Sequence, residues 1–444
     1  MKREHSISAV DYDTCEDKIQ RLVRQYPSIL IDNLKLKSRF LPLEIKTGMA
    51  TPVFSKVRPL FGEKKAEIEQ EILSWEKEGI IRRVDKPVKW ASPIHAVKKP
   101  NGKWRVCGDF RRLNAVTEMD RYPLPSIQDF NARLAGCKIF SKVDLRRAYQ
   151  QVEIKKEDQE KTTINTTLGL YEFLRMPYGL QNAGQCFQRN IHSILSQLPF
   201  VFGYMDDAII GSRNENEHIS QMKQLFEILN KNNIVINYEK CQFARPEIEF
   251  LGHIVSERGI SVPEHRVKTI KEFPTPQNVK QLERFLGVFA FVHRFVRNAS
   301  GLSAKLHTLR TKKNEKDFIK AWTKDHQEAF QDCKHAIQNA TLLSHPQADA
   351  KTEIWSDASD MAMGAVLTQF QNNVWVSISV WSISLNKTSV STAPSFGNGQ
   401  TIISLVPLVT CQFVRITPEL STKKPAPRLS FPSVGLYKKT TLFA

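Results

Sequence analysis

The sequence predicts a protein of mixed helices and strands, of the α+β or the α/β class, with about three domains. The chain has 444 residues, and compact domains hold about 150 residues each. Hydrophobic residues make up 41% of the chain, which is enough to form real cores. Segments with apolar residues at helical spacing alternate with short runs typical of β-strands, and this alternation indicates the fold class.

Helices are predicted where apolar residues recur every three or four positions. Ile68, Ile72 and Trp75 predict a helix over 63–79 that ends at Gly79. The same spacing predicts helices over 218–232 and 279–296, and Pro274 and Pro276 mark a domain boundary before the last of these.

Strands are predicted for short apolar or alternating runs bounded by turn residues. In chain order these are 91–99, 103–110, 138–144, 234–243, 248–256, 351–359 and 364–370. The first two flank an Asn-Gly turn. Residues 1 to about 60 are weakly patterned, and no element is predicted after about residue 387.

Composition limits the classes of partner and compartment. The formal net charge of +18 favours an anionic partner, most commonly nucleic acid, although a basic protein without such a partner stays an alternative. Seven cysteines without a C-x-x-C pattern indicate neither a disulfide framework nor a zinc site, which fits a reducing interior. We expect no secretion signal and no membrane span, because the longest nearly apolar run is too short.

Two adjacent carboxylates interrupt an apolar stretch, "FVFGYMDDAIIGS", over residues 200–212. The run predicts two strands with Asp206 and Asp207 at the turn between them. Aspartate is a common turn residue, so an ordinary turn is one interpretation. However, two carboxylates ~4 Å apart repel by about 1 kcal/mol in water and by more in a dry site. Asp144 ends another predicted strand, and three converging carboxylates are typical of sites that hold two divalent metal ions.

Five segments resemble, in order, the motifs of reverse transcriptases. They are "VKKPNGKWRVCGDFRRLN" (97–114), "FSKVDLRRAYQQV" (140–152), "MPYGLQNAGQCFQR" (176–189), "YMDD" (204–207) and "EFLGHIVSERGI" (249–260). The chain is most similar to the Pol polyprotein of gypsy-type LTR retrotransposons, as "YPLPSIQD", "GLYEF" and "FPTPQNVKQLERFLG" indicate. This resemblance covers roughly residues 40–385.

The resemblance implies a right-hand polymerase of the α+β class, followed by a partial RNase H-like α/β domain. It implies an RNA-directed DNA polymerase that uses a template with a primer and deoxynucleoside triphosphates. Asp144, Asp206 and Asp207 would hold two Mg²⁺ ions, with Mn²⁺ as an alternative, and support in-line phosphoryl transfer. In the family the last aspartate is often the less essential ligand.

Further site residues follow from the matched motifs. Lys98 and Arg105 match cations that contact the triphosphate, although both are also ordinary solvated charges in a basic protein. Tyr149 matches the ring under the nucleotide sugar, which would exclude a 2′-hydroxyl; a core aromatic is the alternative. Tyr178 matches a residue that lines the nucleotide pocket.

The last matched motif predicts a support for the primer terminus. Its residues are Phe250, Leu251 and Gly252, and a plain core strand is the alternative interpretation. Two residues depart from the family pattern elsewhere: Gly184 stands where proline is usual, and Ala148 where glycine is common. Gly184 loosens a backbone that proline would restrain. These departures put efficiency in doubt rather than chemistry.

The expected domains follow the resemblance along the chain. They are a lead-in (1–60), fingers and palm (61–256), thumb and connection (257–345), a partial RNase H-like domain (346–388) and an unmatched tail (389–444). Asp357 matches the first catalytic carboxylate of RNase H, but only Asp360 and Glu419 follow it among acidic residues. We therefore expect a truncated RNase H domain without activity.

Two other interpretations stay open. A catalytically silent nucleic-acid-binding remnant of a degraded element would keep the basic surface without polymerase activity. A viral RNA-dependent RNA polymerase shares the paired aspartates, but Tyr149 and the gypsy-type segments oppose it. We expect an intracellular protein, in the cytoplasm within virus-like particles or in the nucleus, and read the chain as a fragment of Pol.

Overall fold

The computed structural model describes the chain in several stretches: residues 13–31, 37–98, 102, 104–125, 127–311, 314–358, 362–384 and 438–440. These residues form two compact units, and the division falls between Ile248 and Glu249. The finer domain boundaries expected from the sequence, after residues 60, 256, 345 and 388, stay predictions.

A five-stranded sheet lies in the first unit, in the order β1-β6-β5-β2-β3. Its strands are β1 (Ile81–Arg83), β2 (Ser92–Lys98), β3 (Trp104–Gly108), β5 (Ile164–Thr166) and β6 (Gly169–Phe173). Helix α2 (Gly62–Lys77) buries Ile68 and Ile72, and its Trp75 ring lies 5.8 Å from that of Phe173. The helix predicted over 63–79 is confirmed, and it ends where Gly79 takes a φ of 73°.

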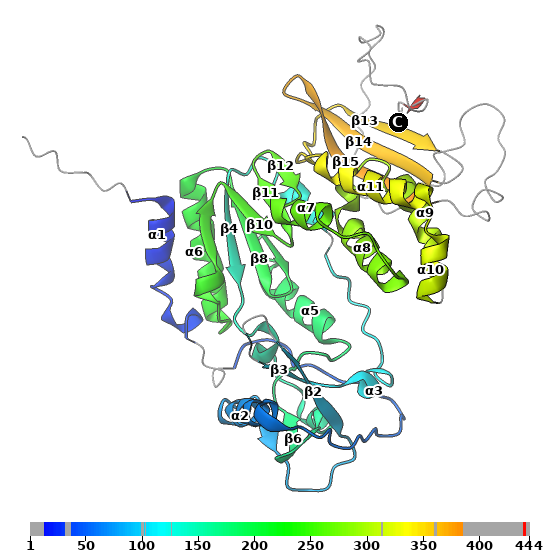
Figure 1. The fold of residues 1–444 in the computed structure, drawn as a ribbon. Helices are drawn as coiled ribbons and strands as arrows, with labels where there is room; N and C mark the ends of the chain where they lie inside the picture. Colours follow the sequence, from blue (N-terminus) through cyan, green and yellow to red (C-terminus); the bar gives the residue numbers. More distant parts are fainter. Residues whose placement is uncertain are drawn as a thin grey trace, which may run out of the picture. The chain divides into compact units, whose positions relative to one another are not determined.

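A four-stranded antiparallel sheet forms the centre of the first unit, in the order β7-β8-β4-β9. Its strands are β4 (Ile139–Asp144), β7 (Val201–Tyr204), β8 (Asp207–Ser212) and β9 (Gln242–Arg245). Ile209 and Ile210 on β8 point to opposite faces, and both are fully buried, so the sheet is covered on both sides. Figure 1 shows helices α5 (Ala183–Leu195) and α6 (Glu215–Lys231) alongside these strands.

Helix α6 shows how the local sequence sets an element. The Asn214 side chain accepts a hydrogen bond from the Glu217 N–H (3.0 Å), which caps the first turn. Met222, Leu225 and Phe226 form part of its buried face. The helix predicted over 218–232 is confirmed, with three more residues at its start, and α1 (Cys15–Val23) contacts it.

The strand predicted over 234–243 is largely wrong. Ile234 and Ile236 are buried and extended, but Ile236 forms only an isolated bridge with Leu145. The chain then turns through a short 3₁₀ helix, η4 (Tyr238–Lys240), before β9 begins. The other short helices of this unit are η1 (Pro27–Ile29), α3 (Arg111–Asn114), α4 (Ile127–Arg133), η2 (Ala148–Gln151) and η3 (Lys156–Thr162).

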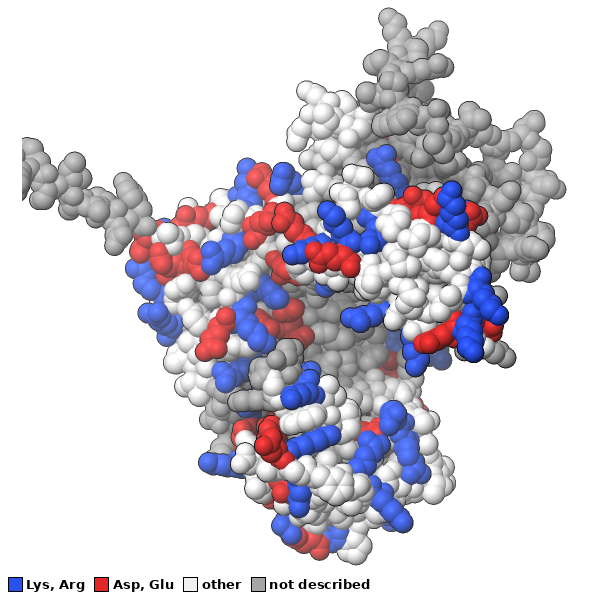
Figure 2. Space-filling view, viewed as in Figure 1, with Lys and Arg blue, Asp and Glu red and all other residues white. Residues whose placement is uncertain are grey.

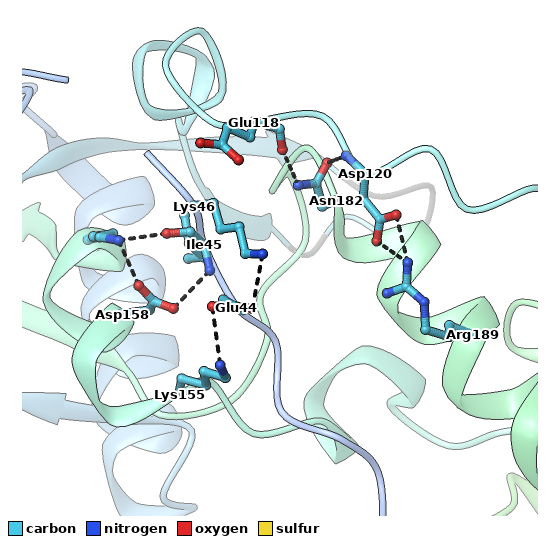
Figure 3. Close-up of polar contacts among 10 residues, drawn as sticks. Glu44, Ile45, Lys46, Glu118, Asp120, Lys155, Asp158, Asn182 and Arg189 are labelled. Carbon is cyan, nitrogen blue, oxygen red and sulfur yellow. Dashed lines mark hydrogen bonds and ion pairs between the residues drawn. The ribbon is translucent and has the colours of Figure 1, made fainter. Parts of the chain in front are cut away.

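The irregular segment before α2 is held to the first unit by polar contacts (Figure 3). The Asp158 carboxylate accepts a hydrogen bond from the Ile45 N–H (2.9 Å) and pairs with Lys161 (2.7 Å). Lys155 lies 3.2 Å from the Glu44 carboxylate. These contacts order a stretch whose sequence shows no periodicity.

The chain passes from the first unit to the second within β10, a strand of a small three-stranded sheet in the order β10-β11-β12. Its strands are β10 (Glu247–Phe250), β11 (His253–Ser256) and β12 (Gly259–Ser261). The single strand predicted over 248–256 is therefore wrong, because Leu251 and Gly252 take φ values of 49° and 74° and turn the chain.

Helices fill the next part of the second unit. They are α7 (Glu264–Lys271), α8 (Val279–Val292), α9 (Ala299–His307), α10 (Glu315–Ala321) and α11 (Lys324–Gln338), with η5 (His293–Phe295) and η6 (Thr308–Thr311) between them. Phe285, Phe289 and Phe330 are among the rings in their common core. The helix predicted over 279–296 is confirmed as α8 and η5. None of the helices in the described stretches is long and apolar enough to cross a membrane.

An antiparallel sheet follows, in the order β15-β14-β13-β16. Its strands are β13 (Thr352–Ala358), β14 (Ala362–Gln371), β15 (Val374–Ser384) and β16 (Lys438–Thr440). The strands predicted over 351–359 and 364–370 are confirmed as β13 and β14. Strand β15 is not predicted from the sequence, although Asn372 and Asn373, with φ values of 48° and 66°, form the two-residue turn that precedes it.

Candidate functional site

Three carboxylates meet at one corner of the four-stranded sheet. Tyr204 on β7 pairs with Asp207 on β8, so Met205 and Asp206 form the two-residue turn between these strands. Asp207 also pairs with Asp144, the last residue of β4. Directly paired residues of an antiparallel ladder have Cα atoms about 4.5–5.5 Å apart. The Leu145 N–H donates to the Asp206 carbonyl oxygen (2.8 Å), which ties the turn to the end of β4.

Two of the three carboxylates lie in a partly dry environment. Burial raises the pKa of Asp144, and the nearby Asp206 charge adds to this, while Lys240 acts in the opposite direction. Burial also raises the pKa of Asp207, which is opposed by Lys142 and reinforced by Asp206 and Asp144. Asp206 itself is exposed. Each negative charge is thus unfavourable to its neighbours, and Lys240 and Lys142 act against this effect.

The donor atoms at this corner fit a divalent cation. Oδ1 of Asp207 is buried and accepts no hydrogen bond; Lys142 Nζ is its ionic neighbour at 3.4 Å. Carboxylate oxygens are the ligands that Mg²⁺ prefers in proteins. Among the residues that the structure describes, no three His, Cys, Asp or Glu side chains already surround a common point.

Gln188 of α5 holds the turn in place, a role that is not predicted from the sequence. Its side chain is 1% exposed. Oε1 accepts a hydrogen bond from the Met205 N–H (2.8 Å), and Nε2 donates to the Gly203 carbonyl oxygen (3.0 Å). Met205 has a φ of 51°, a conformation that a non-glycine residue keeps only when its surroundings enforce it. No local sequence pattern marks this role, because it depends on where α5 packs against the turn.

An aromatic wall stands beside the carboxylates. The rings of Tyr149 and Tyr178 lie 5.1 Å apart, and Tyr149 also lies 5.5 Å from Phe187. Burial raises the pKa of both tyrosines, and the Asp206 charge adds to each shift. Both hydroxyls therefore stay protonated near neutral pH, and both respond to the charge of Asp206.

Gly184 makes room for the side chain of Met205. A Cβ atom at position 184 would lie 2.9 Å from Met205 Cε and 3.7 Å from the Tyr149 hydroxyl. The departure from proline at this position is therefore accompanied by close packing of the turn against α5.

Contacts at the start of α5 fix this helix (Figure 3). The Asn182 side chain accepts from the Asp120 N–H (3.1 Å) and donates to the Glu118 carbonyl oxygen (2.7 Å). Arg189 lies 2.7 Å from both carboxylate oxygens of Asp120. The helix that carries Gly184 and Gln188 is thus anchored at two points.

Lys98 and Arg105, the two cations expected to contact the triphosphate, lie on one hairpin but on opposite faces. Arg105 pairs with Val97 across β2 and β3, whereas Lys98 pairs with Trp104. Paired residues share a face and neighbours in a strand do not, so Lys98 and Arg105 point apart. Both are exposed. The charge of Arg105 acts against the effect of burial on the pKa of Tyr178.

The remaining expected site residues belong to the second unit. Phe250 is fully buried, so its side chain supports the turn at Leu251 and Gly252 from within and offers no contact surface. A side chain at Gly252 would collide with the Arg266 guanidinium. Asp357 pairs with Gly364 in the β13–β14 ladder, and its side chain lies outside the described residues, as does Asp360.

Two family models match the chain. Residues 97–255 match the reverse transcriptase (RNA-dependent DNA polymerase) family. Residues 322–397 match the RNase H-like domain found in reverse transcriptase. The second match begins inside the segment expected to be connection and extends beyond residue 388.

Similar proteins include retrovirus-related Pol polyproteins of Drosophila melanogaster transposons. The one from transposon 297 is 34% identical over 73% of this chain and 31% of its own length, and the one from transposon opus is 32% identical over 86% and 40%. The transposon Tf2-3 polyprotein of Schizosaccharomyces pombe is 33% identical over 70% of this chain and 23% of its own length. The chain thus spans less than half the length of these relatives.

Solved structures of a foamy viral protease-reverse transcriptase share the fold. The complex with an RNA/DNA hybrid has a TM-score of 0.74 at 22% identity and covers 86% of this chain and 51% of that chain. The complex with dsDNA has the same TM-score and covers 80% of that chain. The predicted fold class is confirmed. Residues 97–255 thus match the reverse transcriptase family, and the chain is similar to the Pol polyproteins of retrovirus-related transposons.

Proposed function

We propose that this chain is an RNA-directed DNA polymerase that adds deoxynucleotides to the 3′-hydroxyl of a primer. The observation that carries this proposal is the pairing of Asp144 with Asp207, next to Asp206 in the turn. It joins strands that are distant in sequence and gathers three carboxylates where ordinary turn chemistry needs one. The match of residues 97–255 to the reverse transcriptase family supports the same activity.

We propose that Asp144, Asp206 and Asp207 hold two Mg²⁺ ions, or Mn²⁺ in their place. Such ions, when bound, acidify the primer hydroxyl and neutralise the charge that develops on the phosphates. The protein contributes positioning. The β4–β8 ladder fixes the spacing of the carboxylates, and Gln188 fixes the turn. In-line phosphoryl transfer depends mainly on such positioning and charge neutralisation.

Nucleotide selection is proposed to use the aromatic wall and the β2–β3 hairpin. Tyr149 lies beside the turn, with its hydroxyl 3.9 Å from Met205 Sδ, where its ring would exclude a ribose 2′-hydroxyl. Tyr178 would line the same pocket. Arg105 is the better supported triphosphate contact, since its charge reaches Tyr178, while Lys98 projects from the other face of the hairpin.

Template and primer are the proposed macromolecular partners. Similar solved structures hold an RNA/DNA hybrid or dsDNA, and the net charge of +18 suits a polyanion. Figure 2 shows Lys and Arg side chains gathered at the lower right of the first unit, over the region of α3 in Figure 1. Arg111 and Arg112 are exposed residues of α3. Leu251 and Gly252 are proposed to support the primer terminus through their backbone.

The second activity of the family is proposed to be absent. Residues 322–397 match an RNase H-like domain, but beyond Asp357 the sequence supplies only Asp360 and Glu419 as further carboxylates. Two-metal hydrolysis of a phosphodiester needs several carboxylates together. Degradation of the RNA strand of a hybrid, lost on Asp357→Asn, would overturn this proposal.

An intracellular, reducing location is also proposed, either in cytoplasmic particles or in the nucleus. Six cysteines in the described stretches are free thiols. Such usage is typical of proteins that fold in a reducing compartment.

The second candidate function is a catalytically silent nucleic-acid-binding remnant. The scarcity of acidic residues after Asp357 favours it, because that feature indicates a degraded element. Primer extension separates the two functions. We expect the full chain to extend a DNA primer on poly(rA) with Mg²⁺ and dTTP, and Asp206→Asn to abolish extension while template–primer binding persists. A folded preparation that binds but never extends selects the silent remnant.

A further inference from the structure

Two lysines face the carboxylate corner. Lys142 Nζ lies 3.4 Å from Asp207 Oδ1, and each of these side chains is only 22% exposed. Lys240 Nζ lies 4.0 Å from Asp144 Oδ2, but the Lys240 side chain is 69% exposed. No ion pair involves Asp206 among the described residues. Two of the three carboxylates, Asp207 and Asp144, therefore already face a cationic side chain of the protein.

The sheet register places Lys142 at this position. Lys142 pairs with Ile209, and Asp144 pairs with Asp207, along the same β4–β8 ladder. Residues two apart in a strand share a face, so Lys142 and Asp207 are diagonal neighbours on one side of the sheet. Lys142 also pairs with Gln242 of β9, which holds its backbone between two strands. Its ammonium group is thus a built part of the corner rather than a mobile surface charge.

The two lysines differ in how easily an incoming metal ion displaces them from their carboxylates. The Lys240 side chain lies mostly in water and contacts its carboxylate at the limit of ion-pair distance. Lys142 is four-fifths buried, and the oxygen that it faces accepts no hydrogen bond from any other group. An ion that approaches Asp207 therefore meets a resident cation at the same oxygen.

We infer that Lys142 is an internal counter-ion that competes with a divalent cation for Asp207. It stabilises the corner before metal binds, weakens metal binding at Asp207, and leaves Asp144 and Asp206 as the ligands that accept an ion first. This inference rests on the proposed function, because it concerns the metal that the polymerase would use. Lys142 in this role modulates metal binding and takes no direct part in the reaction itself.

Direct binding of Mn²⁺ to the full chain, without nucleotide or nucleic acid, tests the inference. Electron paramagnetic resonance of free Mn²⁺ gives the dissociation constant. Lys142→Met keeps the aliphatic stem and removes the charge, and we expect it to tighten Mn²⁺ binding about three- to tenfold. Lys142→Arg keeps the charge and should change binding less than twofold. Lys223→Met, on the exposed side of α6, is the matched control for net charge and should also have little effect.

Asp207→Asn, made in the wild type and in Lys142→Met, shows whether the effect of Lys142 acts through Asp207. In the wild-type background it should weaken Mn²⁺ binding less than twofold, and in the Lys142→Met background it should remove the whole gain. Unchanged or weaker Mn²⁺ binding by folded Lys142→Met would overturn the inference; Lys142→Gln replaces it if the methionine variant does not fold. If primers are extended but Lys142→Met gains nothing, only this inference fails. If Mn²⁺ binding behaves as expected but no variant extends a primer, the proposed function fails instead.

Discussion

At the scale of single residues, the turn between β7 and β8 depends on the two hydrogen bonds of Gln188. We predict that Gln188→Met lowers the free energy of unfolding by about 1–3 kcal/mol, because it leaves buried backbone groups of Gly203 and Met205 without partners. Primer extension should fall by about tenfold or more, since displaced carboxylates lose their positioning. Urea unfolding and single-nucleotide incorporation measure the two effects.

Gln185→Met is the control for Gln188, because position 185 lies on the same helix and is only partly buried. It should leave both quantities nearly unchanged. Full activity of Gln188→Met would show that the turn keeps its geometry without the clamp, and would contradict the role given to this residue.

Tyr149 is the second residue whose role is testable alone. Tyr149→Ala opens the space beside Met205, so we predict that the preference for dATP over rATP falls by about tenfold or more. Tyr149→Phe keeps the ring and should keep the preference. The ratio of kcat/KM for the two nucleotides is the measurement, and an unchanged ratio in Tyr149→Ala would assign the ring to the core alone.

At the scale of elements, His218 of α6 joins β4 and β8. Its Nε2 lies 2.7 Å from the Ser141 hydroxyl and its Nδ1 2.6 Å from the Ser212 hydroxyl, with Gln221 hydrogen-bonded to Ser212. Burial lowers the pKa of His218 to about 4, against a weak opposite effect of Glu217. The histidine is therefore neutral in the folded chain at pH values where it is charged in the unfolded chain.

The sign of the pH dependence follows from this lowered pKa. Above about pH 6.5 both states are neutral and the stability is complete; it is lost as the pH falls from about 6.5 toward 4. We predict that His218 costs about 2 kcal/mol of stability at pH 5 relative to pH 7.5. Urea unfolding of wild type and His218→Gln measures the difference, with His265→Gln as the exposed control. Equal pH slopes for wild type and His218→Gln would contradict the prediction.

Elements with strong local signals were predictable from the sequence, and contacts between distant segments were not. Helix α6 follows from its apolar spacing and from the cap at Asn214. The strand predicted over 234–243 is largely wrong because its two buried isoleucines have the spacing of a strand, whereas the chain turns at η4. The resemblance predicted the three aspartates, but the partners Gln188 and Lys142 depend on sheet register and helix placement, which no local pattern contains.

At the scale of the whole molecule, the charge of +18 governs the first encounter with template and primer in the proposed function. Binding releases counterions from the phosphates, so we predict that affinity for an RNA/DNA hybrid falls by at least about tenfold between 50 and 200 mM salt. Fluorescence anisotropy measures this slope. Asp206→Asn should show the same slope, because the loss of one carboxylate leaves the basic surface intact. A flat salt dependence would contradict nucleic acid as the partner.

In the proposed function, β4 and the β7–β8 turn hold one shared metal site. Fe²⁺ in place of Mg²⁺, with ascorbate and peroxide, generates hydroxyl radicals that cleave the backbone next to the bound ion. We predict two cuts, near residues 144 and 206, which disappear together on addition of Mg²⁺ or in Asp206→Asn. Cleavage at only one of these segments, or cleavage that Mg²⁺ does not suppress, would contradict it.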